Sequence, residues 1–261
     1  MTLQLSGYSE KQPLLLARLL TRLKHPQVTQ ANFTDFKQQL VKHWQNSDKN
    51  KPISQLFATL STVMQPNNPT SKALAQALIH ISFSQYQHFT KQLFQQVTLT
   101  VLIHGNWLFA HAQQLSAIIE QAFLNNLDNK YNIQCPVTDI AGKATCLLPV
   151  NLGERDHTCV IYRAFEYKDA NAVALAMITS HLLSPLFFQQ MRTEKQYGYL
   201  VGVGYVPINS YPGIAFYIQS PHSNAFTLAQ AMDEFISASP AALDDISPEQ
   251  WQDLLQGLAS Q

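Results

Sequence analysis

The chain has 261 residues, of which 46% are hydrophobic and 13% charged, against the share of about 25% charged that is usual in globular domains. This length suits one large domain or two modest ones. Lysine plus arginine equals aspartate plus glutamate at 17 each, so the formal net charge is zero. A neutral chain without basic clusters lacks the positive surface that nucleic-acid binding needs. Apolar stretches such as 172–178 are shorter than the ~20 residues that cross a bilayer. We therefore predict no nucleic-acid partner and no membrane partner.

The three cysteines, Cys135, Cys146 and Cys159, are too far apart for a C-x-x-C motif, and their odd number argues against a disulfide framework. We expect free thiols. These fit a reducing compartment such as the cytoplasm without excluding the bacterial periplasm.

Helical patterns dominate the first 95 residues. The alternation over 3–6 predicts a strand, and Ser9 with Gln12 has the form of a capping box before a helix over 14–20. Apolar residues at helical spacing predict four further helices, around the ranges 33–44, 53–64, 70–78 and 86–93.

A change of pattern divides the chain near its middle. The β-branched run 97–103 predicts a strand, and 115–123 another helix. The polar, aperiodic stretch that follows predicts a linker. The expected organisation is a domain of residues 1–130, a linker of residues 131–145 and a second domain of residues 146–261.

The second half alternates strands and helices. A strand is expected at 157–163, followed by an apolar helix over 170–183 that we expect to be buried on all sides. Ser184-Pro185 predicts a new helix to about Lys195, with Gly198 as its left-handed cap. A hairpin should follow over 199–220. Ser223 and Ser247 are expected to begin the last two helices. The fold class is therefore α+β, with antiparallel or mixed sheets covered by helices.

The usual catalytic motifs are absent from the sequence. There is no H-E-x-x-H or H-x-x-E-H, no G-x-S-x-G and no phosphate loop. Gly202-Val203-Gly204 lies in a strand pattern, so it predicts a bare strand face against which a helix packs closely. We expect no metal-binding and no cofactor-binding residue in this chain.

Arg192 and Tyr199 form the candidate site. They lie at the end of a helix and the start of a strand, so the guanidinium and the phenol could converge at a sheet edge. Such rigid donors suit stabilisation of a developing oxyanion. The alternative is structural: an arginine in a last helical turn complements the helix dipole, and a strand tyrosine packs.

Four segments resemble, in order, those of the pitrilysin/insulinase family of zinc metallopeptidases. They are Ser6-Gly7-Tyr8-Ser9-Glu10-Lys11-Gln12-Pro13, Leu102-Ile103-His104-Gly105-Asn106, Phe188-x-x-Met191-Arg192-Thr193-x-x-Gln196-x-Gly198-Tyr199 and Phe216-Tyr217-Ile218-Gln219-Ser220. In this family two homologous halves close around a peptide, and only the N-terminal half carries H-x-x-E-H and zinc.

The resemblance implies a role for Arg192 and Tyr199 as the catalytic pair that reaches the scissile carbonyl from the C-terminal half. Gln189 stands where relatives commonly have asparagine, so no substrate contact is assigned to it. His104 is expected to be structural. The two predicted domains resemble the back half of the family's third domain and the front half of its fourth, which implies a fragment.

The expected function is therefore part of a zinc-dependent endopeptidase. Its zinc would be bound outside this chain by the missing N-terminal half, and the fragment alone would be inactive and could self-associate. One alternative is a non-enzymatic module of the family that assembles with a zinc-bearing partner. Another is an unrelated peptide-binding domain that uses the edge of the 199–220 hairpin.

Overall fold

The computed structural model describes residues 2–95, 97–123, 136–140, 146–152, 156–244, 247, 251–252 and 256–257. The chain divides into two compact units. The first contains Met1–His43 and Ala75–Gln134, and the second contains Trp44–Leu74 and Cys135–Gln261. Most of the predicted linker, Cys135 and most of the helix expected after Ser247 lie outside the described residues. The domain boundaries at 130 and 146 stay a prediction.

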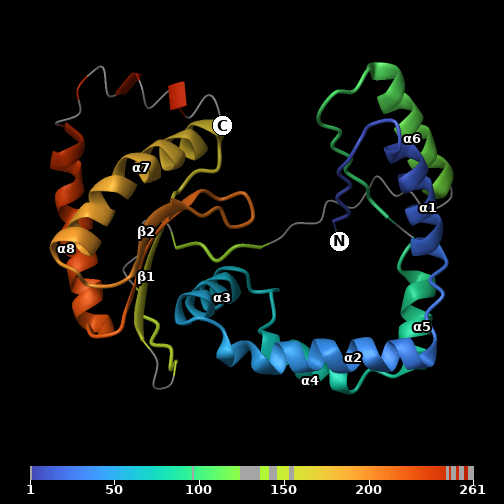
Figure 1. The fold of residues 1–261 in the computed structure, drawn as a ribbon, viewed down its shortest axis with the longest axis horizontal. Coiled ribbons are helices and arrows are strands. Elements are labelled where there is room, and N and C mark those ends of the chain that lie inside the picture. Colours follow the sequence, from blue (N-terminus) through green and yellow to red (C-terminus); the bar gives the residue numbers. More distant parts are fainter. Residues whose placement is uncertain are drawn as a thin grey trace. The chain divides into compact units, whose positions relative to one another are not determined.

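The described residues form helices and one three-stranded sheet, which confirms the α+β class (Figure 1). The helices are α1 (Gln12–Lys24), α2 (Gln30–Gln45), η1 (Asn46–Lys49), α3 (Pro52–Met64), α4 (Ser71–Ile79), α5 (Phe83–Gln92), α6 (Phe109–Phe123), α7 (Ala170–Phe188), η2 (Gln189–Glu194) and α8 (Ala225–Asp244). The strands are β1 (His157–Ala164), β2 (Leu200–Tyr205) and β3 (Gly213–Ser220), antiparallel in the order β1-β3-β2.

The helices expected in the first 95 residues are all present, although one predicted cap is wrong. Helix α1 has Lys11 at its N-cap without a side-chain hydrogen bond. The Gln12 side chain instead donates to Gly7 O at 2.8 Å, so Ser9 and Gln12 form no capping box. A capping box does begin α5, where Ser82 and Gln85 satisfy each other's backbone N–H groups.

The strands expected at 3–6 and 97–103 are wrong. Neither range forms a strand, although Val97 at the start of the second range takes part in a β-bridge. A β pattern becomes a strand only when a neighbour satisfies its backbone groups. The apolar residues of the second range are largely exposed, and Leu102 is 90% exposed.

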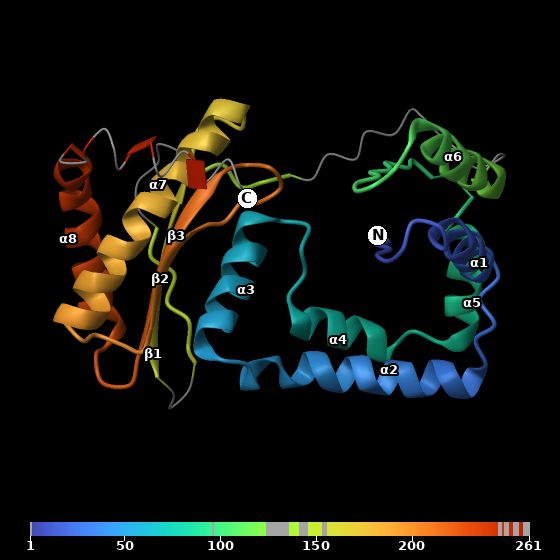
Figure 2. The same cartoon turned by 45° about the horizontal axis from the view of Figure 1, so that its top comes forward.

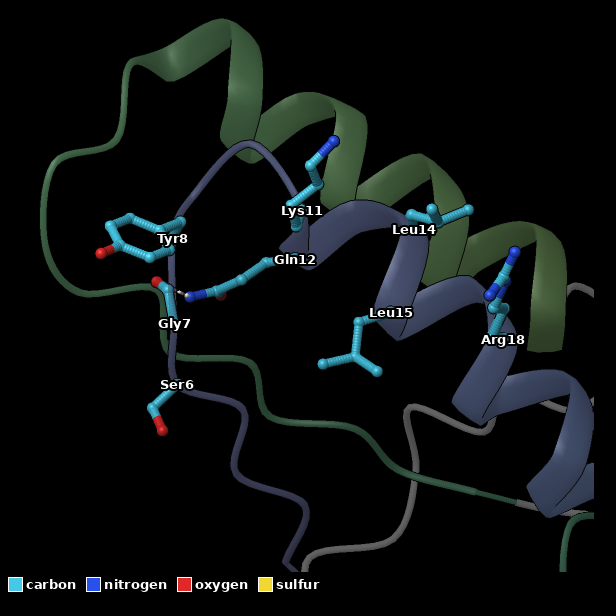
Figure 3. A pocket seen from close by; sticks show the side chains of 8 residues that line it. All are labelled: Ser6, Gly7, Tyr8, Lys11, Gln12, Leu14, Leu15 and Arg18. Carbon is cyan, nitrogen blue, oxygen red and sulfur yellow. Dashed lines mark hydrogen bonds between the residues drawn. The ribbon is translucent and has the colours of Figure 1, made fainter.

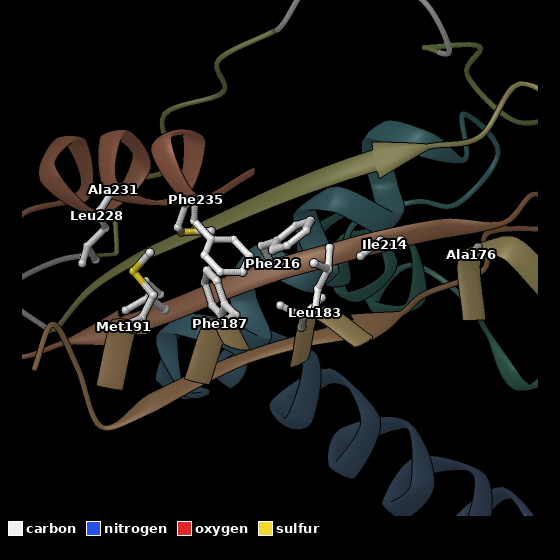
Figure 4. Close-up of a cluster of buried hydrophobic side chains, with 12 residues drawn as sticks. Ala176, Leu183, Phe187, Met191, Ile214, Phe216, Leu228, Ala231 and Phe235 are labelled. Atoms are coloured by element: carbon white, nitrogen blue, oxygen red, sulfur yellow. The ribbon is translucent and has the colours of Figure 1, made fainter. Parts of the chain in front are cut away.

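One face of the sheet carries the main core of the second unit. Ile214, Phe216 and Ile218 of β3 point to this face, where α7 and α8 cover them (Figure 4). The ring of Phe187 in α7 stands edge-on to Phe216 of β3, with ring centroids 5.6 Å apart, and to Phe235 of α8, with ring centroids 5.0 Å apart. The hairpin predicted over 199–220 is confirmed, because β2 and β3 pair antiparallel.

The other face of the sheet is covered by α3, which contacts β1 and β3 (Figure 2). Phe57 of α3 stands edge-on to Tyr217 of β3 at 5.7 Å. Gly202 lies opposite Tyr217 in the register, and a Cβ at Gly202 would lie 2.6 Å from Tyr217 Cζ. The glycine therefore makes room for a cross-strand tyrosine, and not, as predicted, for a helix.

Helix α7 differs from prediction in length and in burial. It continues through Pro185 without a new start at Ser184. Its buried residues form a single stripe rather than surrounding the helix: Ala172, Ala176, Ser180, Leu183 and Phe187. Leu175, Leu186 and Phe188 on its other sides are between 41% and 57% exposed.

By length and composition, the stretch Ala170–Glu194 is apolar enough to cross a membrane, and 28% of an apolar 18-residue window within it is buried in the structure. The core helix of a water-exposed domain has the same composition, and α7 packs on β2 through its buried stripe. We therefore interpret it as a core helix.

The two glycines of β2 provide a matched test of this packing. Gly202→Ala should cost about 1–3 kcal/mol, because the new methyl group overlaps the Tyr217 ring. Gly204→Ala should be neutral or stabilising by up to about 1 kcal/mol, because its Cβ would meet no atom within 4 Å. Denaturant unfolding measures both, and equal effects would contradict the assigned role of Gly202.

Candidate active site at the turn between η2 and β2

Arg192 lies in η2, a π-helical turn that extends α7. The wider turn is visible in the bond from Lys195 N to Gln190 O at 3.0 Å, which spans five residues. The Arg192 side chain is half-buried and lies over the Phe188 ring, 5.6 Å from its centroid. This cation–π contact and the helical backbone fix the direction of the guanidinium.

The chain reverses at Gln196, and this corrects the prediction for Gly198. Gln196 has a φ of 52°, and Tyr197 N then donates to Met191 O at 2.9 Å, closing the helix end with a left-handed residue. Gly198 is needed for a different reason. Its Cβ would lie 2.9 Å from the Gln219 carbonyl carbon, so only glycine lets the backbone pass β3 this closely.

Tyr199 precedes β2, which is an edge strand of the sheet that the described residues form. Its backbone carbonyl accepts a hydrogen bond from Arg192 Nη1. Its side chain is 51% exposed, and the phenol donates to Asp156 Oδ2 at 2.5 Å. Arg192 and Tyr199 are therefore joined through the tyrosine backbone, while the phenol is engaged by a different group.

Gln219 connects this phenol to the sheet. Its side-chain Nε2 donates to the Tyr199 phenol oxygen and, at 3.1 Å, to Asp156 Oδ2. Gln219 is 3% exposed, so its amide is a buried polar group that must be satisfied within the fold. Tyr199, Asp156 and Gln219 thus form one hydrogen-bonded network.

The network shifts the pKa of two of its members in opposite directions. The hydrogen bond from Tyr199, then that from Gln219, lowers the pKa of Asp156. The same bond to Asp156 raises the pKa of Tyr199, with desolvation as a smaller cause. The contribution of Asp156 to stability is therefore lost as the pH falls through its lowered pKa. That of Tyr199 is lost as the pH rises through its raised pKa.

Asp156 and Gln219 were not predicted as site residues. Gln219 gave a signal that could have been used, since it is a polar residue on the strand run Gly213–Ser220, which is otherwise largely buried and apolar. Asp156 gave none, because an acidic residue before a strand is ordinary. Gln189 donates to Glu194 Oε1 at 3.4 Å, and His104 is in the first unit, in a segment without helix or strand.

No three His, Cys, Asp or Glu side chains of the described residues come together as a metal-binding group. The donor chemistry of this part of the chain therefore does not fit a catalytic zinc, which needs three such ligands. That the whole chain binds no metal stays a prediction.

A shallow pocket of about 350 Å³ lies in the first unit, beside the start of α1 (Figure 3). Tyr8, Lys11 and Arg18 contribute to its lining, together with Leu14 and Leu15. Its lining residues include no histidine, cysteine or carboxylate. Its lysine and tyrosine therefore have no carboxylate, histidine or thiol beside them with which to form a catalytic pair, and the pocket is not a competing active site.

Comparison with known proteins gives matches at both ends of the chain. Residues 1–77 match the family model described as the middle or third domain of peptidase M16. Residues 178–261 match the one described as PQQ synthase PqqF-like, C-terminal lobe domain 4. Insulin-degrading enzyme of Homo sapiens is 22% identical over 268 residues, which cover 99% of this chain and 26% of the relative.

Two solved structures are similar in fold. The crystal structure of pitrilysin matches with a TM-score of 0.75 at 18% identity, covering 96% of this chain and 27% of that chain. A peptidase M16 inactive domain from Pseudomonas fluorescens matches with a TM-score of 0.61 at 12% identity, covering 96% and 61%. In fold, the chain is thus of the pitrilysin type. In sequence it resembles the peptidases of the pitrilysin/insulinase family, and it spans about a quarter of the length of the curated relatives it matches.

The opposite pKa shifts of Asp156 and Tyr199 can be tested in the chain itself. In Asp156→Asn the side-chain carbonyl can still accept the phenol hydrogen, but the charge that disfavours the phenolate is gone. The pKa of Tyr199 should therefore fall toward the ordinary tyrosine value. Carbon-13 NMR of tyrosine labelled at Cζ measures it, with Tyr199→Phe assigning the signal.

The matched control is Asp48→Asn, because Asp48 is an exposed carboxylate that pairs with Lys72 at 2.9 Å. It should leave the Tyr199 titration unchanged. An unchanged Tyr199 pKa in Asp156→Asn would contradict the observed network.

Proposed function

We propose that this chain is the part of a zinc-dependent endopeptidase that contacts the substrate carbonyl through Arg192 and Tyr199. The proposal rests on the hydrogen bond that joins these two residues. The Arg192 guanidinium donates to the Tyr199 backbone carbonyl at the start of an edge strand. The similarity to peptidases of this family supports it. The substrate is then a peptide, and the partner is a zinc-bearing N-terminal half outside this chain.

Both side chains can act as donors held in place by the fold. The guanidinium carries five N–H groups, and the structure assigns its Nη1 to Tyr199 O. The phenol is half exposed and carries one hydrogen, which it gives to Asp156. A substrate carbonyl would take the place of Asp156 as the acceptor. Donors placed in advance stabilise the negative charge that develops on that oxygen in the transition state.

Zinc, when bound, supplies the Lewis acid that activates water in such enzymes. The described residues of this chain offer no ligand set for it, so its ligands would come from the zinc-bearing half. The contribution of this chain is to orient and to stabilise, and we propose that it is inactive alone.

A second candidate function is a non-enzymatic module that assembles with a zinc-bearing partner chain. The similarity to a solved structure described as an inactive domain favours it. The two candidate functions predict different gene arrangements. An upstream in-frame H-x-x-E-H region indicates one long enzyme, and a separate gene for the zinc-bearing half indicates an assembled module.

In the zinc-bearing assembly, Tyr199→Phe should lower kcat by about 10- to 1,000-fold, because one oxyanion donor typically contributes about 2–4 kcal/mol. KM should change less, because the contact strengthens in the transition state. Arg192→Lys should also lower kcat, since an ammonium group keeps the charge but loses the planar fork.

Steady-state kinetics and thermal melting of the same preparations separate catalysis from folding. The control is Tyr167→Phe, an exposed tyrosine of the same unit that is 65% exposed and should leave kcat unchanged. Normal kcat with a lowered melting temperature in Tyr199→Phe would show that the tyrosine is only structural.

The 261-residue chain alone should bind no stoichiometric zinc and cleave no peptide, because neither its sequence motifs nor its described residues provide a ligand set. Metal analysis and a peptidase assay of the purified chain measure both. One tightly held zinc per chain would overturn the assignment of the metal to another part of the protein.

A further inference from the structure

The orientation of the Gln219 amide is fixed by its surroundings. Its Oε1 accepts from Ile53 N at 3.3 Å, and its Nε2 faces the Asp156 carboxylate at 3.1 Å. A flipped amide would place its oxygen against a carboxylate and its NH₂ group against a backbone donor. Only the observed orientation satisfies both neighbours.

This orientation places a donor on the Tyr199 phenol oxygen. A phenol has one hydrogen to give and oxygen lone pairs that accept. Because Gln219 donates to the oxygen, it holds that atom in place without using its hydrogen. The hydrogen remains available, to Asp156 in this structure and to another acceptor when one replaces Asp156. A donor on the oxygen also polarises the O–H group and strengthens its outgoing hydrogen bond.

Helix α3 provides the rigid base for this contact. The N-cap of α3, Lys51, makes no side-chain hydrogen bond, and Gln219 of β3 accepts from the first turn in its place. Two residues earlier on the same strand face, Tyr217 packs against Phe57 of α3. The Gln219 side chain therefore extends from the central strand β3 and is held between the start of α3 and the Tyr199–Asp156 pair.

We propose that Gln219 is the positioning residue for Tyr199, holding the phenol oxygen at a point set by α3 while leaving its hydrogen free to be donated to substrate. The positioning rests on the observed network, and its value for catalysis rests on the proposed peptidase function. Gln219 does not touch the reacting atoms in this assignment and acts only through Tyr199.

Two substitutions test the donor role. Gln219→Met has a similar shape without a polar group, so the phenol oxygen loses its donor and the Tyr199 pKa should rise further. Gln219→Glu offers no donor while ionised, but its protonated form carries one O–H. The displacement of the Tyr199 Cζ NMR signal caused by Gln219→Glu should therefore diminish as the pH falls. The displacement caused by Gln219→Met should not.

The matched control is Thr158→Val. Thr158 pairs with Gln219 in the register of β1 and β3, and its buried hydroxyl has no hydrogen-bond partner among the described residues. Removing this hydroxyl should leave the Tyr199 signal and pKa unchanged. Tyrosine Cζ NMR of the 261-residue chain provides this measurement without any peptidase activity.

In the zinc-bearing assembly, Gln219→Met should lower kcat by about 3- to 10-fold, the worth of one neutral hydrogen bond. The same substitution should have no further effect in a Tyr199→Phe background, because its route runs through the phenol. An equal loss in both backgrounds, or an unchanged Tyr199 signal in folded Gln219→Met, would overturn the inference.

The proposed function can fail separately. If Tyr199→Phe leaves kcat unchanged, the catalytic assignment of Tyr199 is wrong, whatever the NMR result. If Tyr199→Phe lowers kcat but Gln219→Met changes neither kcat nor the Tyr199 signal, the function stands and the positioning role of Gln219 is wrong.

Discussion

Burial of β3 on both faces is the constraint from which the second unit follows. Its odd and even positions must satisfy different neighbours, because successive side chains of a strand point to opposite sides. Phe216 and its even-numbered companions fill the aromatic core under α7 and α8. Tyr217 and Gln219 face α3 instead. Tyr217 makes an edge-on aromatic contact with α3, and the buried Gln219 amide accepts a hydrogen bond from its first turn.

The candidate site inherits its geometry from this two-sided strand. Arg192 is positioned from the core side, as the continuation of a helix whose Phe187 and Met191 are fully buried. The Tyr199 phenol is positioned from the opposite side, through Gln219 and α3. The turn between η2 and β2 joins these two supports, since the Arg192 guanidinium donates to the Tyr199 backbone. The placement of the pair therefore depends on both faces of the sheet at once.

The sequence predicted well those features that depend on local periodicity. The ranges of α2, α3 and α5 follow from apolar residues at helical spacing, and the inward face of the 199–220 hairpin follows from alternation. Features that depend on distant partners were missed. The run 97–103 has a strand pattern but forms no strand beyond a β-bridge at Val97. Ser184-Pro185 resembles a helix start inside what tertiary packing makes a continuous helix. Arg192 and Tyr199 were found by family resemblance, whereas Asp156 lies 43 residues before Tyr199 and carries no local signal.

The π-helical turn that holds Arg192 also has a consequence for how this site tolerates changes in chain length. A π-turn contains one residue more than an α-helical turn closed over the same span. Each residue of an α-helix turns the backbone by about 100°, so deleting one residue from Gln189–Glu194 would regularise the helix and swing the arginine away from the edge strand. Replacing a side chain there keeps the direction and alters only the chemistry. At the positions of this segment other than Arg192, exchanges of residue type should therefore be accepted more readily than insertions or deletions.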